Sequence, residues 1–384
     1  MSALPAIATM IRELIRRPSV SCTDAAFDQS NRAVIDILAE WLDGLGFQIQ
    51  IMPVADGKAN LLATLGGGLG SGEGLVLAGH TDTVPYDEQG WSSDPFGGAE
   101  KDGRIYGLGS CDMKGFFALA IAAAAKFSAQ QLRHPLTLLA TADEESSMSG
   151  ARHLYTHGTK PGRFAVIGEP TGLRPIRMHK GVMMECIRVH GAAGHSSDPS
   201  LGASAIEGMH AVIGELLIWR SELQKRYRNP LFKVDVPTLN LGSIHGGDNP
   251  NRICAHCELH IDIRPLPGMD LNELRQCLSE RLAGVLLAYP RLRLETYPLF
   301  DGLPAFETGF DSEIVRACEE YSGRSAGAVA FGTEAPFLSM LGTQTVVLGP
   351  GDIEQAHQPD EYLELSRIPP MVEILERLIG QFCL

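Results

Sequence analysis

Hydrophobic residues in the first 175 positions recur with two different spacings that alternate along the chain. A helical spacing over residues 30–45 ends at Gly46, a residue type that commonly follows a helix, and residues 47–52 alternate as a strand does. Short, almost wholly apolar runs are typical of strands buried on both faces. They lie at residues 75–78, 136–142 and 164–167. Residues 114–127 are a predicted helix between two of these runs. This order indicates an α/β domain with a mostly parallel central sheet and flanking helices.

The middle of the chain has a different pattern. Strands are predicted at residues 184–189, 237–244, 252–264 and 291–297, and long helices at 203–226 and 270–288. Two helices and about four strands of this kind make a two-layer α+β domain. The remaining residues return to the first pattern. We therefore predict a discontinuous catalytic domain, residues 1–178 and 299–384, interrupted by an inserted domain, residues 179–298.

Composition and charge narrow the possible partners. The chain has 46 acidic and 32 basic residues and a formal net charge of −14, whereas nucleic acids and anionic membranes require a basic surface. The longest apolar run, residues 116–125, is shorter than the about 20 residues that span a bilayer. Charged residues interrupt the helical pattern at residues 5–15, so no secretory signal is predicted. Because 8 cysteines are few for a chain of this length, we expect a cytoplasmic protein with free thiols.

Acids and histidines gather directly after the predicted strands, where ligands bind in open α/β sheets. The strongest candidates are His80, Asp112, Glu145, Glu169 and His357. Taken singly, each has an ordinary explanation, such as a surface turn, a helix N-cap or a solvated loop. Taken together, two imidazoles and three carboxylates suit two Zn²⁺ ions that share one bridging carboxylate and one water.

Two of these clusters contain a second acid. His80 and Asp82 are two residues apart and face the same side of an extended segment, so Asp82 can fix the orientation of the imidazole. Glu144 and Glu145 point in opposite directions in an extended segment. One of them can therefore bind a metal while the other acts as a base.

Along essentially its whole length the chain resembles the M20 family of dinuclear zinc amidohydrolases. The segments that carry the resemblance are GHTDTVP (79–85), GLGSCDMKG (107–115), ATADEES (140–146), IGEPT (167–171) and AHQPDEYL (356–363). The resemblance implies a zinc-peptidase-like catalytic domain in which Asp112 bridges the two metals. His80 and Glu169 would complete one metal site, and Glu145 and His357 the other. It also implies that Asp82 supports His80, that Glu144 is the general base, and that the peptide bond from Asp112 to Met113 is cis.

The resemblance further implies a homodimer with two Zn²⁺ ions per subunit, for which Co²⁺ can substitute. The inserted domain would be the lid and dimerisation domain, and its His195 would reach the active site of the partner subunit. Cys111 lies where relatives commonly have alanine. A thiol there has either a packing role or a sensitivity to oxidation and thiol-binding metals.

Residues 195–199, 238–269, 332–338 and 348–364 carry a narrower resemblance, which implies hydrolysis of N2-acetyl-L-ornithine in arginine biosynthesis. Arg264, assisted by Asn251, would hold the substrate carboxylate, with Arg252 as an alternative. Glu334 would meet the side-chain ammonium, with Thr333 nearby. The other reading is that Arg264 and Glu334 form structural ion pairs.

Several alternatives remain open at this point. A succinyl-diaminopimelate desuccinylase would share the metal site, although such relatives usually have serine in place of Glu334. A broader aminoacylase or dipeptidase is also possible. A non-catalytic metal-binding module would not need Glu144. A thiol–disulfide oxidoreductase using Cys254 and Cys257 would keep its activity in chelators, but the alternating pattern around this pair favours a strand.

Overall fold

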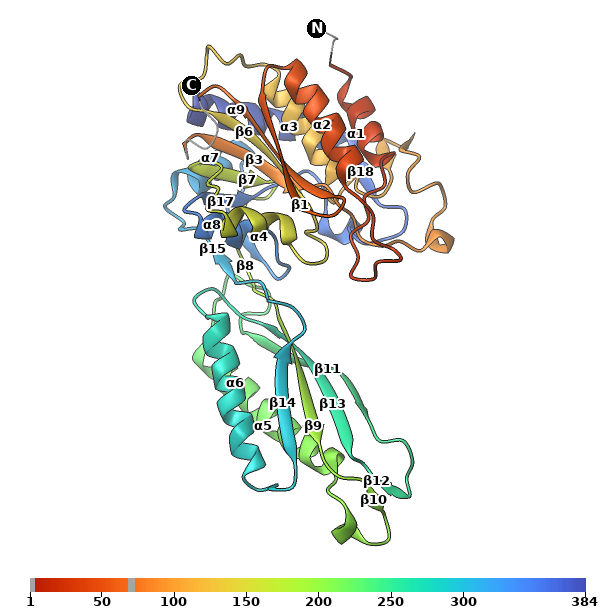
Figure 1. Cartoon of the computed structure of the whole chain (residues 1–384). Coiled ribbons are helices and arrows are strands. Elements are labelled where there is room, and N and C mark those ends of the chain that lie inside the picture. Colours follow the sequence, from red (N-terminus) through yellow and green to blue (C-terminus); the bar gives the residue numbers. More distant parts are fainter. Residues whose placement is uncertain (1–3, 68–72) are drawn as a thin grey trace. The chain divides into compact units, whose positions relative to one another are not determined.

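The computed structural model describes residues 4–67 and 73–384, which divide into two compact units (Figure 1). The first contains the described residues up to Arg177, together with residues 308–327 and 333–384. The second contains Met178–Glu307 and Ala328–Gly332. Residues 299–307, which the sequence analysis assigned to the catalytic domain, lie in the second unit, where β15 (Phe306–Glu307) pairs with His179 and Met178.

The largest sheet has a parallel centre and antiparallel flanks. Among the described residues its strand order is β1-β2-β6-β3-β7-β17-β8-β15, and β16 pairs with β8. The strands are β1 (Gln48–Ala55), β2 (Lys58–Leu65), β3 (Leu75–His80), β6 (Leu136–Thr141), β7 (Phe164–Ile167), β8 (Ile176–His179), β15, β16 (Gly327–Val329) and β17 (Gln344–Val347). The adjacent strands β6, β3, β7 and β17 are parallel. The predicted α/β fold with a mostly parallel central sheet is confirmed.

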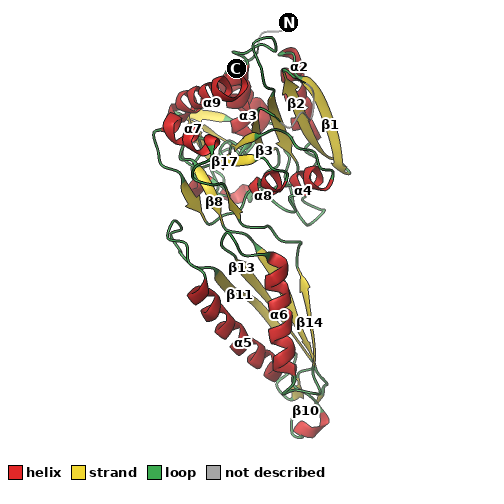
Figure 2. Ribbon diagram, turned by 90° about the vertical axis from the view of Figure 1, so that its left-hand side faces the viewer, coloured by secondary structure: helices red, strands yellow, loops and turns green. Residues whose placement is uncertain are grey.

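Helices cover both faces of this sheet (Figure 2). One face carries α1 (Ile7–Ile15), α2 (Arg32–Gly44), α3 (Lys114–Ala124), α7 (Glu313–Ser322) and α9 (Ile368–Cys383), which share one hydrophobic core with the strands. The opposite face carries α4 (Ser149–Thr156) and α8 (Ala335–Met340). The helix α3 has small and apolar residues all round because it is buried between α1, α9 and the sheet. A separate small sheet has the order β18-β5-β4, from Tyr362–Glu364, Arg104–Tyr106 and Ala99–Lys101.

The second unit is a two-layer α+β structure, as predicted. Its antiparallel sheet has the order β11-β13-β9-β14, from Thr238–Gly246, His256–Arg264, Met183–His190 and Arg293–Pro298. The helices α5 (Ala205–Arg226) and α6 (Leu271–Leu286) pack on one face of it. Both helices begin at side-chain caps, because Ser204 and Asp270 accept hydrogen bonds from backbone N–H groups of the first turn.

The predicted strand at residues 252–264 is interrupted. A short strand β12 (Arg252–Ile253) pairs with β10 (Gly194–His195), and only His256–Arg264 joins the main sheet as β13. All eight cysteines are free thiols. Cys254 and Cys257 of the CxxC pair are buried, whereas Cys22 and Cys277 are partly buried. Within the described part of the chain, no helix combines the length and the apolar character that crossing a membrane requires.

Candidate metal centre

The five predicted metal ligands lie together at one edge of the parallel sheet. His80 is the last residue of β3, while Glu145 and Glu169 follow β6 and β7. These three strands are adjacent and parallel, so their carboxyl ends meet. Asp112 comes from the loop before α3, and His357 from the loop that precedes β18.

Asp112 lies between the two histidines. Its Oδ1 is 3.2 Å from His80 Nε2, and its Oδ2 is 3.5 Å from His357 Nε2. Each histidine faces one further acid, since His80 Nε2 is 3.8 Å from Glu169 Oε1 and His357 Nε2 is 3.0 Å from Glu145 Oε1. Two zinc ligands about 2.1 Å from the ion and at a tetrahedral angle are about 3.4 Å apart. The four separations bracket this value, so the donor set fits two metal ions with Asp112 between them.

Asp82 supports both His80 and the loop after β6. The Nδ1–H of His80 donates to the backbone oxygen of Asp82 (3.0 Å), while the Asp82 carboxylate is 3.6 Å from Nδ1. The carboxylate instead accepts from the backbone N–H groups of Glu144 (3.2 Å) and Glu145 (3.0 Å). The sequence analysis expected the carboxylate itself to orient His80, whereas the backbone oxygen makes the shorter contact. The effect on His80 is the same, because Nε2 faces the other ligands.

Only the first of the three consecutive acids after β6 is neutralised by a lysine. Asp143 Oδ1 is 2.7 Å from Lys58 Nζ and accepts a hydrogen bond from Ser21 Oγ (3.0 Å). Its φ of +57° turns the backbone there. Asp143 is thus held away from the ligands, and Glu144 and Glu145 are left to face them. Sequence reasoning did not find Lys58, which lies on β2, far from this loop in the sequence.

The acids of the centre are crowded and buried. Burial raises the pKa values of the Glu144 and Glu169 carboxyls well above the ordinary value for glutamate. It also raises the pKa of Glu145. Hydrogen bonds with Asp112 and Glu145 raise the pKa of His357 to about 10. Burial thus penalises the charged forms of these carboxyls when no cation is close to them. Divalent cations would relieve this penalty.

Glu334 and Thr333 lie at the start of α8, near this centre. Glu334 is buried, and its Oε1 has no hydrogen-bond partner among the described residues. Burial raises the pKa of this carboxyl to about 7, and His80 and Asp82 are close enough for their charges to act on it. Thr333 Oγ1 accepts from the backbone N–H of Ala335 (3.2 Å), the first residue of α8. Glu334 is therefore a buried acid with an unused acceptor.

His195, Asn251 and Arg252 lie together in the second unit. His195 pairs with Arg252 between β10 and β12, and Asn251 directly precedes β12. The His195 side chain is exposed, and its Nδ1 is 2.7 Å from Ser197 Oγ. Arg252 forms an exposed ion pair with Asp248, with 2.6 Å between Nη1 and Oδ2.

Arg264 lies at the other end of β13, where its Nε is 2.9 Å from Asp262 Oδ2. A strand rises about 3.3 Å per residue, so the eight steps of β13 separate its ends by about 26 Å. Asn251 precedes the near end and Arg264 forms the far end. Arg264 and Asn251 were expected to hold one carboxylate together, but within one chain they do not meet.

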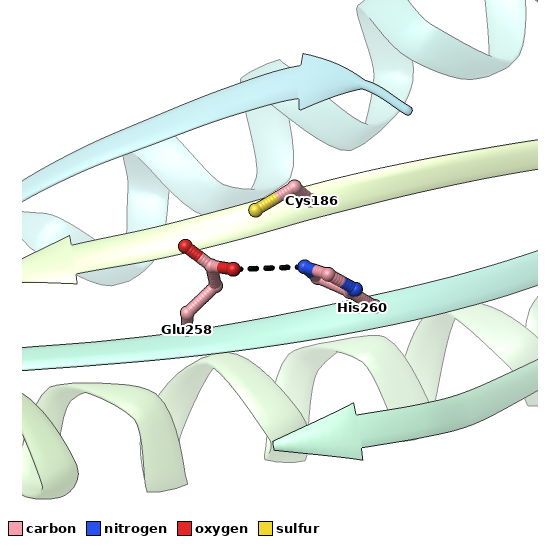
Figure 3. Close-up of side chains that lie close together, drawn as sticks. All are labelled: Cys186, Glu258 and His260. Carbon is pink, nitrogen blue, oxygen red and sulfur yellow. Dashed lines mark hydrogen bonds and ion pairs between the residues drawn. The ribbon is translucent and has the colours of Figure 1, made fainter. Parts of the chain in front are cut away.

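A second group of possible metal ligands lies on the sheet of the second unit (Figure 3). It consists of Cys186, Glu258 and His260, of which Cys186 and His260 are cross-strand neighbours. Glu258 already has a cationic partner, because its Oε2 is 2.5 Å from Arg188 Nη2, and its Oε1 is 2.9 Å from His260 Nε2. This group lacks the excess of buried carboxylates that marks the centre in the first unit, and we assign no metal to it.

Two further buried residues, Cys111 and Glu361, lie beside Asp112. Cys111 is buried, and its thiol is 3.3 Å from the backbone oxygen of Asp352. Burial raises the pKa of this thiol well above its ordinary value, which favours packing over reactivity.

The sequence analysis assigned no role to Glu361, yet its buried carboxylate accepts hydrogen bonds from the loop that carries Asp112. The peptide bond from Asp112 to Met113 is cis, as the resemblance implied.

Known proteins resemble this chain over nearly its whole length. The profile described as "Peptidase family M20/M25/M40" matches residues 76–381. The acetylornithine deacetylase of Proteus mirabilis (strain HI4320) is 52% identical over 383 residues, which cover 99% of this chain and 98% of the relative. The acetylornithine deacetylase of Pasteurella multocida (strain Pm70) is 48% identical over 385 residues and is covered completely, as is this chain.

Solved structures show the same fold at much lower sequence identity. An M20 family metallo-carboxypeptidase from Sulfolobus solfataricus has a TM-score of 0.76 at 18% identity, with 99% of both chains covered. A Bacillus subtilis protein described as a dinuclear metal binding peptidase from the M20 family has a TM-score of 0.66 at 16% identity. The match covers 98% of this chain and 97% of that one.

Proposed function

The chain belongs to peptidase family M20/M25/M40, and we propose that it hydrolyses N2-acetyl-L-ornithine to L-ornithine and acetate. The observation that carries this proposal is the identity of about half of all residues with acetylornithine deacetylases, over nearly the full length of both chains. The arrangement of acids and histidines around Asp112 is compatible with such a metal-dependent amide hydrolase.

The metal ligands are assigned from the contacts of the centre. Asp112 would bridge two ions, with His80 and Glu169 on one and Glu145 and His357 on the other. We propose Zn²⁺ for both positions, with Co²⁺ as a substitute, because nitrogen and oxygen ligands suit either. When bound, the ions would lower the pKa of a shared water and polarise the acetyl carbonyl.

Glu144 is the proposed general base. It is buried beside the ligands and belongs with His80 and Glu169 to one compact group of possible donor atoms. The backbone N–H of Glu144 is held by Asp82, which fixes the start of the side chain. The Glu144 carboxylate takes the proton that leaves the attacking water and returns it to the nitrogen of ornithine as the amide bond breaks.

Substrate recognition follows from the two charged groups of acetylornithine. The unused acceptor of buried Glu334 suits the side-chain ammonium, and Thr333 holds the helix start from which Glu334 projects. Arg264 would hold the α-carboxylate. Asn251 cannot join Arg264 within one chain, so we assign it, with His195 and Arg252, to the active site of the partner subunit. There His195 would stabilise the oxyanion that forms on the acetyl group.

A homodimer through the second unit would supply these groups. The strand β11 is the edge of its sheet, and edge strands have unpaired backbone groups. Beside it, Ile206 on α5 is 48% exposed and Ile244 on β11 is 52% exposed. These two residues border a hollow of about 290 Å³ that Met209 and Ile213 also line. We propose that a second copy covers this apolar surface, with the second unit acting as dimerisation domain and lid.

We place the enzyme in the cytoplasm, in arginine biosynthesis.

The direct test measures hydrolysis of N2-acetyl-L-ornithine by protein stripped of metal and then reloaded with Zn²⁺ or Co²⁺. Succinyl-diaminopimelate and N-acetylmethionine are assayed in parallel. Release of ornithine only after reloading, with little desuccinylation, is the expected result. Activity on succinyl-diaminopimelate instead, or ornithine release that chelators do not affect, would contradict the proposal.

A further inference from the structure

Glu361 is a buried acid that has no assigned role in the proposed reaction. It is only 1% exposed and directly precedes β18. Its carboxylate accepts three hydrogen bonds from backbone N–H groups. Oε1 accepts from Cys111 (2.7 Å) and Asp112 (3.0 Å), and Oε2 accepts from Gly109 (3.1 Å). All three donors belong to the loop that ends at the bridging acid.

The backbone around Glu361 strengthens this connection. The backbone oxygen of Glu361 accepts from the N–H of Gly107 (2.9 Å), and β18 pairs with β5, which precedes the same loop. Gly109 has a φ of +83°, and a Cβ there would lie 2.5 Å from the Cε of Lys114. The loop therefore follows a narrow path in which its N–H groups converge on one carboxylate.

The two segments joined by Glu361 both carry metal ligands. The loop residues 109–112 end at Asp112, and His357 lies four residues before Glu361 in its own segment. Asp112 must direct one oxygen toward His80 and the other toward His357. A small rotation of the backbone at Asp112 would move both oxygens. A group that holds the N–H of Asp112 thus controls both contacts at once.

We propose that Glu361 is a positioning residue that clamps the loop 109–112 and thereby sets the direction of the Asp112 carboxylate toward both metal sites. The inference rests on the proposed function, since it takes Asp112 as the bridging ligand. A carboxylate is needed because it has two acceptor oxygens. One accepts from the N–H groups of Cys111 and Asp112, and the other accepts from the N–H of Gly109. An amide of the same shape has one acceptor oxygen, and its NH₂ group would face an N–H donor.

The test is Glu361→Gln, with Glu364→Gln as the matched control. Glu364 is the last residue of β18, the strand that Glu361 directly precedes, and its carboxylate forms ion pairs of 3.6 Å with Arg104 and Arg367. Zn²⁺ affinity is measured by competition with a chelator, and the electronic spectrum of the Co²⁺ form reports the ligand geometry. Loss of a group that orients a metal ligand commonly weakens metal binding about 10–100-fold. We expect a loss of this size and a changed Co²⁺ spectrum for E361Q, and wild-type values for E364Q.

An E361Q protein with wild-type Zn²⁺ affinity and an unchanged Co²⁺ spectrum would overturn the positioning role. A drop in the thermal stability of the metal-free protein with both readouts unchanged would overturn it as well, because this is what a purely structural residue predicts. If E361Q does not fold, Glu361→Asp replaces it, since it keeps both oxygens on a shorter arm. A changed Co²⁺ spectrum is then expected, and an unchanged one refutes the clamp. Wild-type protein that binds no metal would instead refute the proposed function and, with it, this inference.

Discussion

The metal centre in the first unit and the His195 region in the second unit are held in opposite ways. Around the centre, buried carboxylates from elsewhere in the sequence fix the loops that carry the ligands: Asp82 holds the loop with Glu144, and Glu361 holds the loop with Asp112. His195 lies on a two-residue strand and is exposed. Its side-chain contact is to Ser197, only two residues further along.

This difference separates groups that one chain orients by itself from groups that need another surface. Ligands held by buried hydrogen bonds are already in place before substrate or partner arrives, which favours electrostatic stabilisation. An exposed histidine beside an exposed asparagine and arginine has no such support. In the proposed homodimer, the second subunit would give it fixed neighbours.

The largest effect is expected at Glu144. Glu144→Gln keeps the size of the side chain but removes the base, so kcat should fall by about 10²–10⁴-fold, the range for general acid–base catalysis. Metal content, measured on the purified protein, should stay near the wild-type value because Glu144 is not a proposed ligand.

Glu145→Gln is the matched control, with the same chemical change at the adjacent residue. Glu145 faces His357 at 3.0 Å and is a proposed ligand. This variant should therefore lose metal as well as activity. Near wild-type turnover in E144Q, or equal metal loss in both variants, would show that the two roles are assigned wrongly.

His195→Ala should lower kcat by about 10²–10³-fold with little change in metal content, since it removes a donor to the developing oxyanion. The contrast with the metal centre is sharpened by mixing this variant with E144Q. In a mixed dimer one active site has both Glu144 and His195 of the partner subunit, so random mixing should restore about a quarter of wild-type activity.

Restored activity requires that subunits exchange, which size and mass measurements on the mixture would establish. If dimers exchange and no activity returns, His195 acts within its own chain. If the protein is monomeric and active at assay concentrations, the second-unit surface around Ile206 and Ile244 is not a dimer interface. Either result would mean that the His195 region does not depend on a second subunit.

Glu334→Ala tests the substrate side of the metal centre. A hydrogen bond to a charged group is worth about 1.5–3 kcal/mol, so kcat/KM for acetylornithine should fall about 10–100-fold. N-acetylmethionine has no ammonium in its side chain, and its kcat/KM should change only slightly. Equal losses on both substrates would mean that Glu334 has a structural role.

The same residue predicts a pH dependence. Burial raises the pKa of Glu334 to about 7, so the carboxylate that pairs with the ammonium forms as pH rises through this value. The kcat/KM for acetylornithine should therefore increase relative to that for N-acetylmethionine between about pH 6 and 8. The ratio of the two should become independent of pH in Glu334→Gln.

The smallest effect is expected at Cys111. Its thiol is 3.3 Å from the backbone oxygen of Asp352, and a neutral hydrogen bond contributes about 1 kcal/mol. Cys111→Ala should thus keep kcat and Zn²⁺ affinity near wild type, with a slightly lower midpoint of thermal unfolding. A large loss of metal affinity would show that the thiol supports Asp112 directly.

Much of the fold and the set of candidate ligands could be predicted because both depend on local patterns. Apolar runs mark β3, β6 and β7, and the polar residues that follow them meet because parallel neighbouring strands end at one edge. The short helices α4 and α8 were not predicted. They have too few residues for a clear period, and packing against each other and the sheet stabilises them.

Contacts between distant segments were the part that sequence reasoning missed. Lys58 neutralises Asp143 across strands, and nothing near either residue indicates the pairing. The break between β12 and β13 was also missed, because an alternating pattern continues through Cys254 although the first part pairs with β10. Arg264 and Asn251 were expected to act together, yet within one chain the length of β13 keeps them apart.

The sequence by itself determined the order of the elements, the excess of acids and histidines after the strands, and, through its resemblance to a family, the role expected of each ligand. Periodicity and composition are properties of neighbouring residues, so no tertiary information is needed to read them. Only the tertiary structure decided that Glu361 holds the loop of Asp112, that Asp82 holds Glu144 and Glu145, and that Asn251 lies far from Arg264. These contacts join residues that are far apart along the chain, and burial and hydrogen-bond geometry arise only when the chain has folded.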